Sequence, residues 1–164
     1  MIQHTYRLLK LLDATGVIRG RKKLQKMVHL LKSAGMEFPF NYQYHHYGPY
    51  SAPLQETMNH LIQQNYIEER LEAGAYVYQI TDEGKQFKTL LETKGKYSFA
   101  VDEDVMKALL EKNSQFLEVV STYVFLLESG DTSEEAKAKT LELKPHLVEY
   151  VDDAIHFYEQ QILQ

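Results

Sequence analysis

The spacing of the apolar residues changes abruptly at Gly35. In the segment before it, RGRKKLQKMVHLLKSAG, apolar residues recur every three or four positions, which predicts an amphipathic helix whose first two turns are basic. In the segment after it, FPFNYQYHHYGPYS, the rings of Phe38, Phe40, Tyr42 and Tyr44 alternate with other residues. Alternation is typical of a strand, on which every second side chain shares a face. The sequence therefore predicts helices combined with a short β-component.

The alternating rings admit three interpretations. Rings on a strand that lies between helices are typical of a core, in which the Tyr hydroxyls find partners at the rim. Alternatively, Tyr and His rings stack on nucleic-acid bases, or His45 and His46 form an acid–base pocket, since histidine changes its charge near neutral pH. We favour the core, and we expect Gly48 and Pro49 to form the turn that aims the next helix.

The remaining segments of the first half complete a recognisable order. The segment TYRLLKLLDATG predicts a helix that stops at Gly16, and APLQETMNHLIQQ predicts a helix capped by Ser51. The segments YIEERL and YVYQI predict a β-hairpin around a glycine turn. The segment TDEGKQFKTLLETKG predicts a helix capped by Thr81. The order is helix, helix, short strand, helix, strand, turn, strand, helix. This order predicts a winged helix-turn-helix domain in residues 1–96. In that fold the third helix is the usual reader of the DNA major groove, and the hairpin is the wing.

Residues 97–164 are predicted to form an acidic helical extension. Residues 103–128 carry apolar side chains at steps of four and three, with Asn113 as a polar member that can fix the register between helices. Thr132 and Glu135 have the spacing of a capping box. After Pro145, which bends or interrupts the chain, apolar residues from Val148 to Ile162 supply a second seam, so we expect two antiparallel helices. The fold class is therefore mainly α with a small β-component.

The apolar side chains of the two seams must be buried, and there are two ways in which this can happen. The helices either fold back on the winged domain or pair with a second copy of the chain. We favour a homodimer through these helices, because an unbroken helix over 103–128 would span ~39 Å, which exceeds the face of a small domain.

Charge is divided unequally between the two halves. The net charge is −5, but residues 1–96 contain 13 Lys and Arg against 9 Asp and Glu, whereas residues 97–164 contain 5 against 14. The halves therefore carry +4 and −9. A basic half indicates a surface for nucleic acid. An acidic tail that only keeps the protein soluble explains the numbers equally well.

Double-stranded DNA is accordingly one expected partner, and a partner protein is the other. The basic residues of the second helix would contact phosphates, and the polar residues of the third helix would reach base edges. The candidate DNA-binding residues are Arg19, Arg21, Lys22, Lys23, Lys26, Gln55, Asn59, His60 and Gln63. Two observations oppose DNA: the third helix contains no Lys or Arg, and the wing around Glu68, Glu69, Arg70 and Glu72 is net acidic. We expect a DNA-binding regulatory protein, with a non-catalytic protein-interaction module as the alternative.

Other chemistry finds little support in the residues. The chain has no cysteine, which excludes disulfides and thiolate metal sites, and its histidines lack the spacing of metal ligands. Its serines lack a nucleophile-elbow setting, and no glycine loop for phosphates is present. We therefore predict no catalytic residues, no metal, no cofactor and no enzymatic activity. The first residues, MIQHTYRLLKLLDATG, resemble neither a signal peptide nor a membrane span, so a cytoplasmic location without a membrane partner is expected.

Three strings carry a resemblance to known proteins: KLQKMVHLLK at 23–32, YHHYGPYS at 44–51 and YQITDEGK at 78–85. Together they resemble the uncharacterised YwgA-like winged-helix group and, more distantly, the helix-turn-helix part of SocA/Panacea-type antitoxin and adaptor domains. The resemblance covers about the first ninety residues. It implies a winged-helix fold and, by analogy, regulation or complex formation. The YwgA-like group has no established reaction, so the resemblance gives no catalytic residues to carry over.

Overall fold

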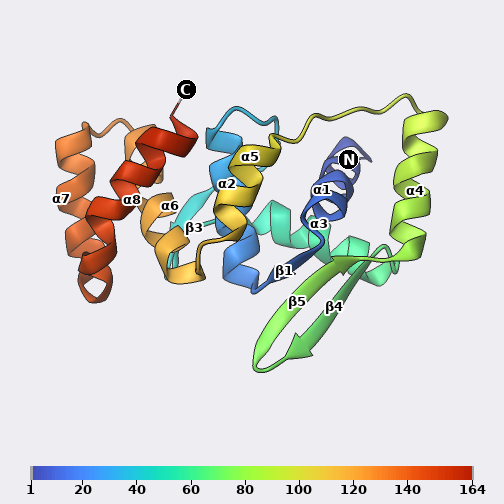
Figure 1. The fold of residues 1–164 in the computed structure, drawn as a ribbon, viewed down its shortest axis with the longest axis horizontal. Helices are drawn as coiled ribbons and strands as arrows, with labels where there is room; N and C mark the ends of the chain where they lie inside the picture. The colour runs from blue at the N-terminus through green and yellow to red at the C-terminus, as the bar shows by residue number, and fades with distance from the viewer. Residues whose placement is uncertain (1, 164) are drawn as a thin grey trace.

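The computed structural model describes residues 2–163, in which helices predominate and two small antiparallel sheets lie among them (Figure 1). The first half comprises α1 (Ile2–Thr15), β1 (Val17–Arg19), α2 (Arg21–Ser33), β2 (Gln43–His45), β3 (Gly48–Tyr50), α3 (Ala52–Gln63), β4 (Ile67–Glu72), β5 (Ala75–Ile80) and α4 (Asp82–Thr93). The second half comprises α5 (Glu103–Leu110), α6 (Ser114–Glu128), α7 (Ser133–Leu143), a 3₁₀ segment (Pro145–Tyr150), α8 (Val151–Phe157) and a π-helical turn (Tyr158–Ile162). The predicted mainly α architecture with a small β-component is confirmed.

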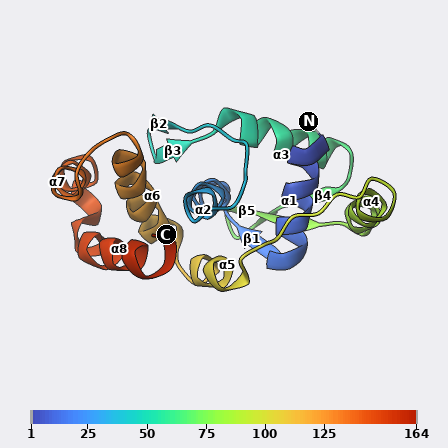
Figure 2. The same ribbon diagram turned by 90° about the horizontal axis from the view of Figure 1, so that it is seen from above.

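Helix α2 lies at the centre of the molecule, surrounded by elements of both halves (Figure 2). It packs on α5 and α6 on one side and on β1, β3 and β5 on others, so that eight consecutive residues, 24–31, are buried. Amphipathic spacing alone predicts one buried stripe on this helix. The second half covers the remaining faces, and the hydrophobic core runs without interruption from α1 to the end of α8.

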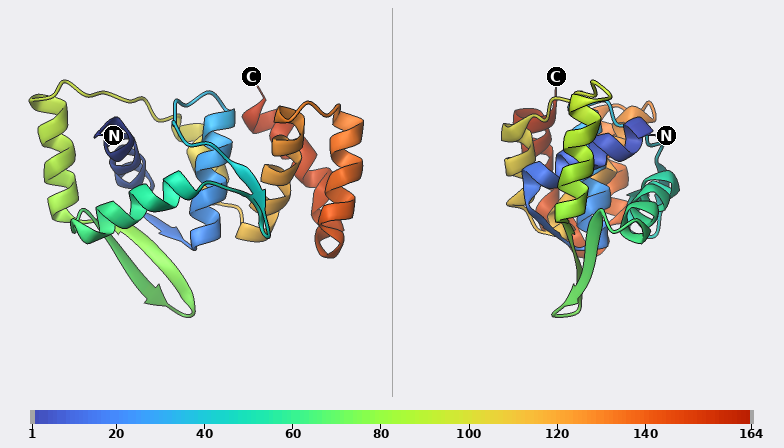
Figure 3. Two further views of the ribbon diagram at one scale, coloured as in Figure 1. Left: turned by 180° about the vertical axis from the view of Figure 1, so that it is seen from behind. Right: turned by 90° about the vertical axis from the view of Figure 1, so that its right-hand side faces the viewer.

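The predicted hairpin is confirmed, and it belongs to a three-stranded sheet of order β1–β5–β4. Strand β1 was not predicted, since three residues between Gly16 and Gly20 are too short to show alternation. The β4–β5 turn places Ala73 and Gly74 at positive φ, as a tight two-residue turn requires. The hairpin projects from the body of the molecule below α3 (Figures 1 and 3). The prediction of Ser51 and Thr81 as helix caps is also confirmed.

The ring-rich segment is only partly a strand, which corrects the prediction. Phe38 and Phe40 are buried in irregular backbone, and pairing begins only where β2 meets β3. The turn falls at residues 46–47, and Gly48 and Pro49 lie in β3 rather than in the turn. Pairing fails earlier because the side chains at 38 and 40 enter the core beside α1 and Phe99, away from any partner strand.

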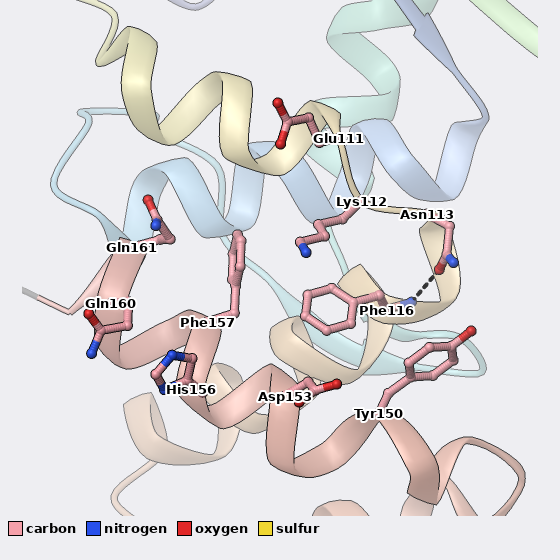
Figure 4. A pocket seen from close by; sticks show the side chains of 10 residues that line it. All are labelled: Glu111, Lys112, Asn113, Phe116, Tyr150, Asp153, His156, Phe157, Gln160 and Gln161. Atoms are coloured by element: carbon pink, nitrogen blue, oxygen red, sulfur yellow. Dashed lines mark hydrogen bonds between the residues drawn. The ribbon is translucent and has the colours of Figure 1, made fainter.

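The predicted unbroken helix over 103–128 is wrong. The chain leaves helical geometry after α5, and the Asn113 side chain accepts a hydrogen bond from the backbone N–H of Phe116 at 2.8 Å, which starts α6 (Figure 4). Asn113 therefore caps a helix instead of fixing a register between helices, because an Asn side chain can satisfy a free N–H of the first turn. The length argument for a homodimer no longer applies, and the homodimer stays a prediction.

The predicted pair of antiparallel helices is replaced by α6, α7 and α8, which pack on one another, with α6 against α2 (Figure 1). Pro145 interrupts the second seam as expected, and the capping box of Thr132 and Glu135 is present. Apolar spacing predicts that Leu90 in α4 and Val148 in the second seam are buried, but both are half exposed. Among residues 2–163, no helix combines the length and the apolar character that a bilayer span requires.

Candidate functional site

A pocket of about 480 Å³ opens between α2, the β2–β3 hairpin and α3. We call it the α2–α3 pocket. Its lining comes from three elements: Arg21, Lys22, Gln25 and Lys26 on α2, His45, His46, Tyr47 and Tyr50 on the hairpin, and Gln55 and Asn59 on α3. The described residues that line it include three cations and no carboxylate. A pocket with this lining favours negatively charged groups.

Gln25 fixes the walls of the pocket relative to one another. Its amide N–H donates to the carbonyl of Ser51 at 3.0 Å, and its amide oxygen accepts from the N–H of Ser51 at 2.8 Å. Ser51 is fully buried, and its hydroxyl accepts from the N–H of Leu54, which starts α3. This pair of bonds joins α2 to the point where the hairpin becomes α3, so the pocket is preorganised.

Lys26 forms the floor of the pocket. Its side chain is 2% exposed, and its ammonium donates to the carbonyl of Pro49 at 2.6 Å. Burial lowers the pKa of Lys26 to about 8, because a charged ammonium loses its hydration there. The carboxylate of Glu118 opposes this effect, and the neighbouring charges of Lys144 and Lys22 add to it.

Glu118 of α6 is the carboxylate shared by this group of lysines. It is buried and lies 2.9 Å from the Lys144 ammonium and 3.6 Å from that of Lys22. Lys144, which follows α7, is equally buried. With all four side chains ionised, three positive charges face one negative charge, which leaves a net +2. We call Lys22, Lys26, Lys144 and Glu118 the lysine cluster.

The structure brings five of the predicted DNA-binding residues together in the pocket and leaves four outside it. Arg21, Lys22, Lys26, Gln55 and Asn59 line the pocket; Arg19, Lys23, His60 and Gln63 do not. The amide of Gln55 donates to that of Asn59 at 3.0 Å, whereas His60 and Gln63 are exposed further along α3.

Most of the predicted cations already have partners within the protein. The guanidinium of Arg19 lies 3.4 Å from Glu72. That of Arg21 lies over the Tyr76 ring, donates to the Tyr78 hydroxyl and lies 3.5 Å from Glu69. These contacts join β1 and α2 to the β4–β5 hairpin.

Two lysines of the predicted set are likewise engaged inside the molecule. The ammonium of Lys23 donates to the carbonyl of Leu110 at 2.6 Å, which ties α2 to the end of α5. Lys26, expected on a polar face, is buried because α6 and the hairpin cover it. The cations therefore hold the fold together as well as lining its surface.

Sequence reasoning favoured the core for the rings of the hairpin, and it missed the contribution of the second half of the chain. His45 and Tyr50 stack obliquely with ring centres 4.9 Å apart, and the Lys22 ammonium lies 4.4 Å from the centre of the Tyr47 ring. His45 falls on the opposite face of the strand from Tyr42 and Tyr44, which point inward. This alternation is the sequence signal that could have placed His45 at the surface. For Glu118 and Lys144 no local signal exists, since they reach the cluster only through tertiary packing.

A second polar group joins α2 to α6. His29 Nδ1 lies 2.6 Å from the Ser121 hydroxyl, and Nε2 lies 2.9 Å from the carboxylate of Glu128, which also accepts from Ser33. Burial alone would raise the pKa of Glu128, but its bonds with His29 and Ser33 and the charge of Lys32 lower it overall. Because Ser121 is fully buried, we interpret the group as a link between helices. Part of the +4/−9 division thus serves contacts inside the chain.

A larger pocket of about 630 Å³ lies between α8 and the connection from α5 to α6 (Figure 4). There the Lys112 ammonium lies 5.0 and 5.7 Å from the ring centres of Phe116 and Phe157. The lining also contains the carboxylates of Glu111 and Asp153, so its charge is mixed. It contains none of the predicted DNA-binding residues. Within residues 2–163, no three His, Asp or Glu side chains converge in a way that could hold a metal ion.

Comparison with known proteins identifies the family of the chain. A scan against family models finds no match. The sequence is 31% identical over 173 residues to the uncharacterized protein YwgA of Bacillus subtilis (strain 168), and the match covers 98% of this chain and 97% of that protein. The chain belongs to the YwgA family. The predicted resemblance to YwgA-like proteins is thereby confirmed, and it extends past the first ninety residues to the segments that supply Glu118 and Lys144. The more distant resemblance to SocA/Panacea-type domains stays a prediction.

Proposed function

We propose that this YwgA-family chain is a non-catalytic protein-interaction module on a winged helix-turn-helix scaffold, which docks a partner protein on the α2–α3 pocket and the adjoining face of α3. The scaffold is supported by the order of α2, α3 and the β4–β5 hairpin, and by the pairing of β1 with that hairpin. The pocket is the docking point because it is concave, braced by the Gln25–Ser51 bonds and ringed by side chains that protein interfaces favour.

The engagement of the predicted cations carries this proposal. Binding to duplex DNA draws on several Lys and Arg side chains that are free to neutralise phosphates. Here Arg19 and Arg21 pair with wing carboxylates, and Lys22 and Lys23 face Glu118 and a backbone carbonyl. The wing is neutralised further, because Arg70 lies between Glu68 and Glu72. A partner protein does not require a continuous positive stripe.

The composition of the pocket agrees with a protein partner. Tyr and Arg are enriched at the energetic centres of protein interfaces, where they combine apolar area with hydrogen-bonding capacity. Tyr47 is 56% exposed beside the half-buried Tyr50, and Arg21 stands at the same rim. Leu71 near the tip of the wing is 65% exposed and provides a second apolar contact.

A second candidate is a DNA-binding regulatory protein that uses the same face. Its support is the absence of carboxylates from the described lining of the pocket, next to the exposed polar side chains Asn59, His60 and Gln63 of α3. Asn and Gln can pair with adenine in the major groove. A homodimer would present two such faces at a fixed spacing.

Two measurements decide between the candidates. In the first, the purified chain captures proteins from a nuclease-treated lysate of its source organism, beside the variant Tyr50→Ala/Asn59→Ala and the control Lys85→Ala on the exposed face of α4. We expect one stoichiometric protein with the native chain and the control, reduced at least tenfold with the double variant. Equal capture by all three would reject the pocket as the docking point.

The second measurement is a titration of randomised duplex DNA at low salt, followed by fluorescence anisotropy. We expect no saturable binding at micromolar protein, because the cations of α2 either pair with groups of the protein or, like Lys26, lie buried at the floor of a pocket that a duplex backbone does not enter. Saturable binding with a steep salt dependence that Lys22→Ala flattens would reject the interaction module in favour of DNA binding.

A further inference from the structure

The lysine cluster carries a net positive charge, which a bound anion would compensate. A lysine ammonium is rarely buried unless a charged partner accompanies it, because removal from water is costly. Glu118 is already shared by Lys144 at 2.9 Å and Lys22 at 3.6 Å. Lys26 is left with a backbone carbonyl as its hydrogen-bond acceptor. The cluster therefore lacks negative charge on the side where Lys26 and Lys22 meet the pocket.

The pocket supplies what an anionic group would need. Its described lining adds the guanidinium of Arg21, the hydroxyls of Tyr47 and Tyr50, and the amides of Gln55 and Asn59, and contains no carboxylate. Hydrogen bonds in which one partner is ionised are shorter and stronger than neutral ones. The Gln25–Ser51 bonds hold these donors in place before any ligand arrives.

We propose that the α2–α3 pocket is a binding site for a phosphate monoester, with Lys26 at its floor and Lys22 at its mouth. A phosphate monoester carries about −1.5 to −2 charges at neutral pH and three acceptor oxygens. That charge matches the net +2 of the lysine cluster, whereas one carboxylate would leave half of it uncompensated. As the site of partner docking, this inference rests on the proposed function, and it adds the chemical group that the pocket recognises.

Two sources can present this group, a phosphorylated side chain of the partner protein or a small nucleotide that regulates docking. Both would place the phosphate on Lys26. They differ in what occupies the rim, because a nucleotide would lay its base against the rings of His45 and Tyr50. A phosphorylated peptide would instead run across α3 past Asn59.

The test uses the full chain and three probes: inorganic phosphate, a phosphoserine-containing peptide and adenosine monophosphate. Binding is measured by isothermal titration calorimetry at low salt, in the native chain, in Lys26→Met and in Lys85→Met, which removes an exposed lysine of α4. We expect saturable binding of at least one ester probe, unchanged in Lys85→Met and weakened at least tenfold in Lys26→Met. Absence of binding for all three probes, or equal binding by the two variants, overturns the proposal.

A second variant protects the test against misfolding. If Lys26→Met does not fold, Lys22→Met serves in its place, since its side chain is 40% exposed and contributes from the mouth of the pocket. Tighter binding of the peptide than of the nucleotide identifies a modified partner, and the reverse identifies a small ligand; either supports the phosphate site. Probe binding without any captured partner would retain this inference and reject the proposed function. Partner capture by a chain that binds none of the three probes would reject only the phosphate site.

Discussion

The ring-rich segment 36–50 has a first half, residues 36–42, and a second half, residues 43–50, which contain similar residue types but differ in burial. In this comparison, first half and second half refer to this segment. In the first half, Phe38 and Phe40 are 2% and 0% exposed, and their rings contact Phe99 and His4. In the second half, Tyr47 is 56% exposed and lines the pocket with two histidines. The first half meets apolar surfaces of α1 and the segment after α4, and the second half meets the cations of α2. Neighbours, rather than the rings themselves, decide which half becomes core.

The largest effect should come from removing a ring of the first half. Phe40→Ala deletes a fully buried ring and leaves a cavity, so we expect the free energy of unfolding to fall by about 3–5 kcal/mol. Tyr47→Ala, the matched change in the second half, should alter it by less than about 0.5 kcal/mol, because that ring is mostly in solvent. Urea denaturation of both variants measures the difference. Similar losses in the two variants would remove the distinction between the halves.

Local signals in the sequence were sufficient for some of this architecture. The caps at Ser51 and Thr81 and the capping box at Thr132 and Glu135 depend on residues within one helical turn, and the structure has all three. Asn113 shows how a local signal can be ambiguous. Its position in a four–three pattern suggests a helix seam, but the same side chain is also a strong N-cap, and the cap is what forms.

The pocket was less predictable, because its electrostatics depend on distant residues. Lys26 stands on what spacing alone marks as a polar face of α2, yet Glu118 and Lys144 reach it from positions roughly a hundred residues away in the chain. The five pocket residues that were predicted were chosen for exposure on α2 and α3. Their convergence on the hairpin could not be read from either helix alone.

The second-largest effect concerns the stability contributed by Lys26, whose ammonium donates a hydrogen bond to the carbonyl of Pro49 in the second half of the ring-rich segment. Burial lowers the pKa of Lys26 from 10.5 to about 8, so the folded protein releases this proton at a lower pH than the unfolded chain does. Stability should therefore rise as pH increases from 8 to 10.5, by up to about 3 kcal/mol from this group. Below pH 8 the ammonium is charged in both states, and its burial cost is fully present.

Other groups titrate in the same range, so the comparison is made between variants. The free energy of unfolding is measured by urea denaturation at pH 7, 8, 9 and 10 for the native chain and for Lys26→Met. The native chain should gain on the variant as pH rises, because the variant has no proton to release at this position. A difference that is independent of pH would mean that Lys26 keeps an ordinary pKa and that the floor of the pocket is well hydrated.

The smallest effect tests how closely β3, in the second half of the ring-rich segment, packs against α6. Gly48 in β3 has φ +92, and a Cβ placed there would lie 3.0 Å from the Thr122 hydroxyl. Gly130, which follows α6, has φ +107 with open space around it, so it shares the backbone strain without the contact. We expect Gly48→Ala to cost about 1–2 kcal/mol more than Gly130→Ala, since the strain of a left-handed residue is common to both. Equal losses in thermal or urea denaturation would show that the hairpin can move away from α6, and the pocket would then not be preorganised. A larger loss in Gly48→Ala, together with weaker binding of the phosphate probes, would tie the shape of the pocket to this contact.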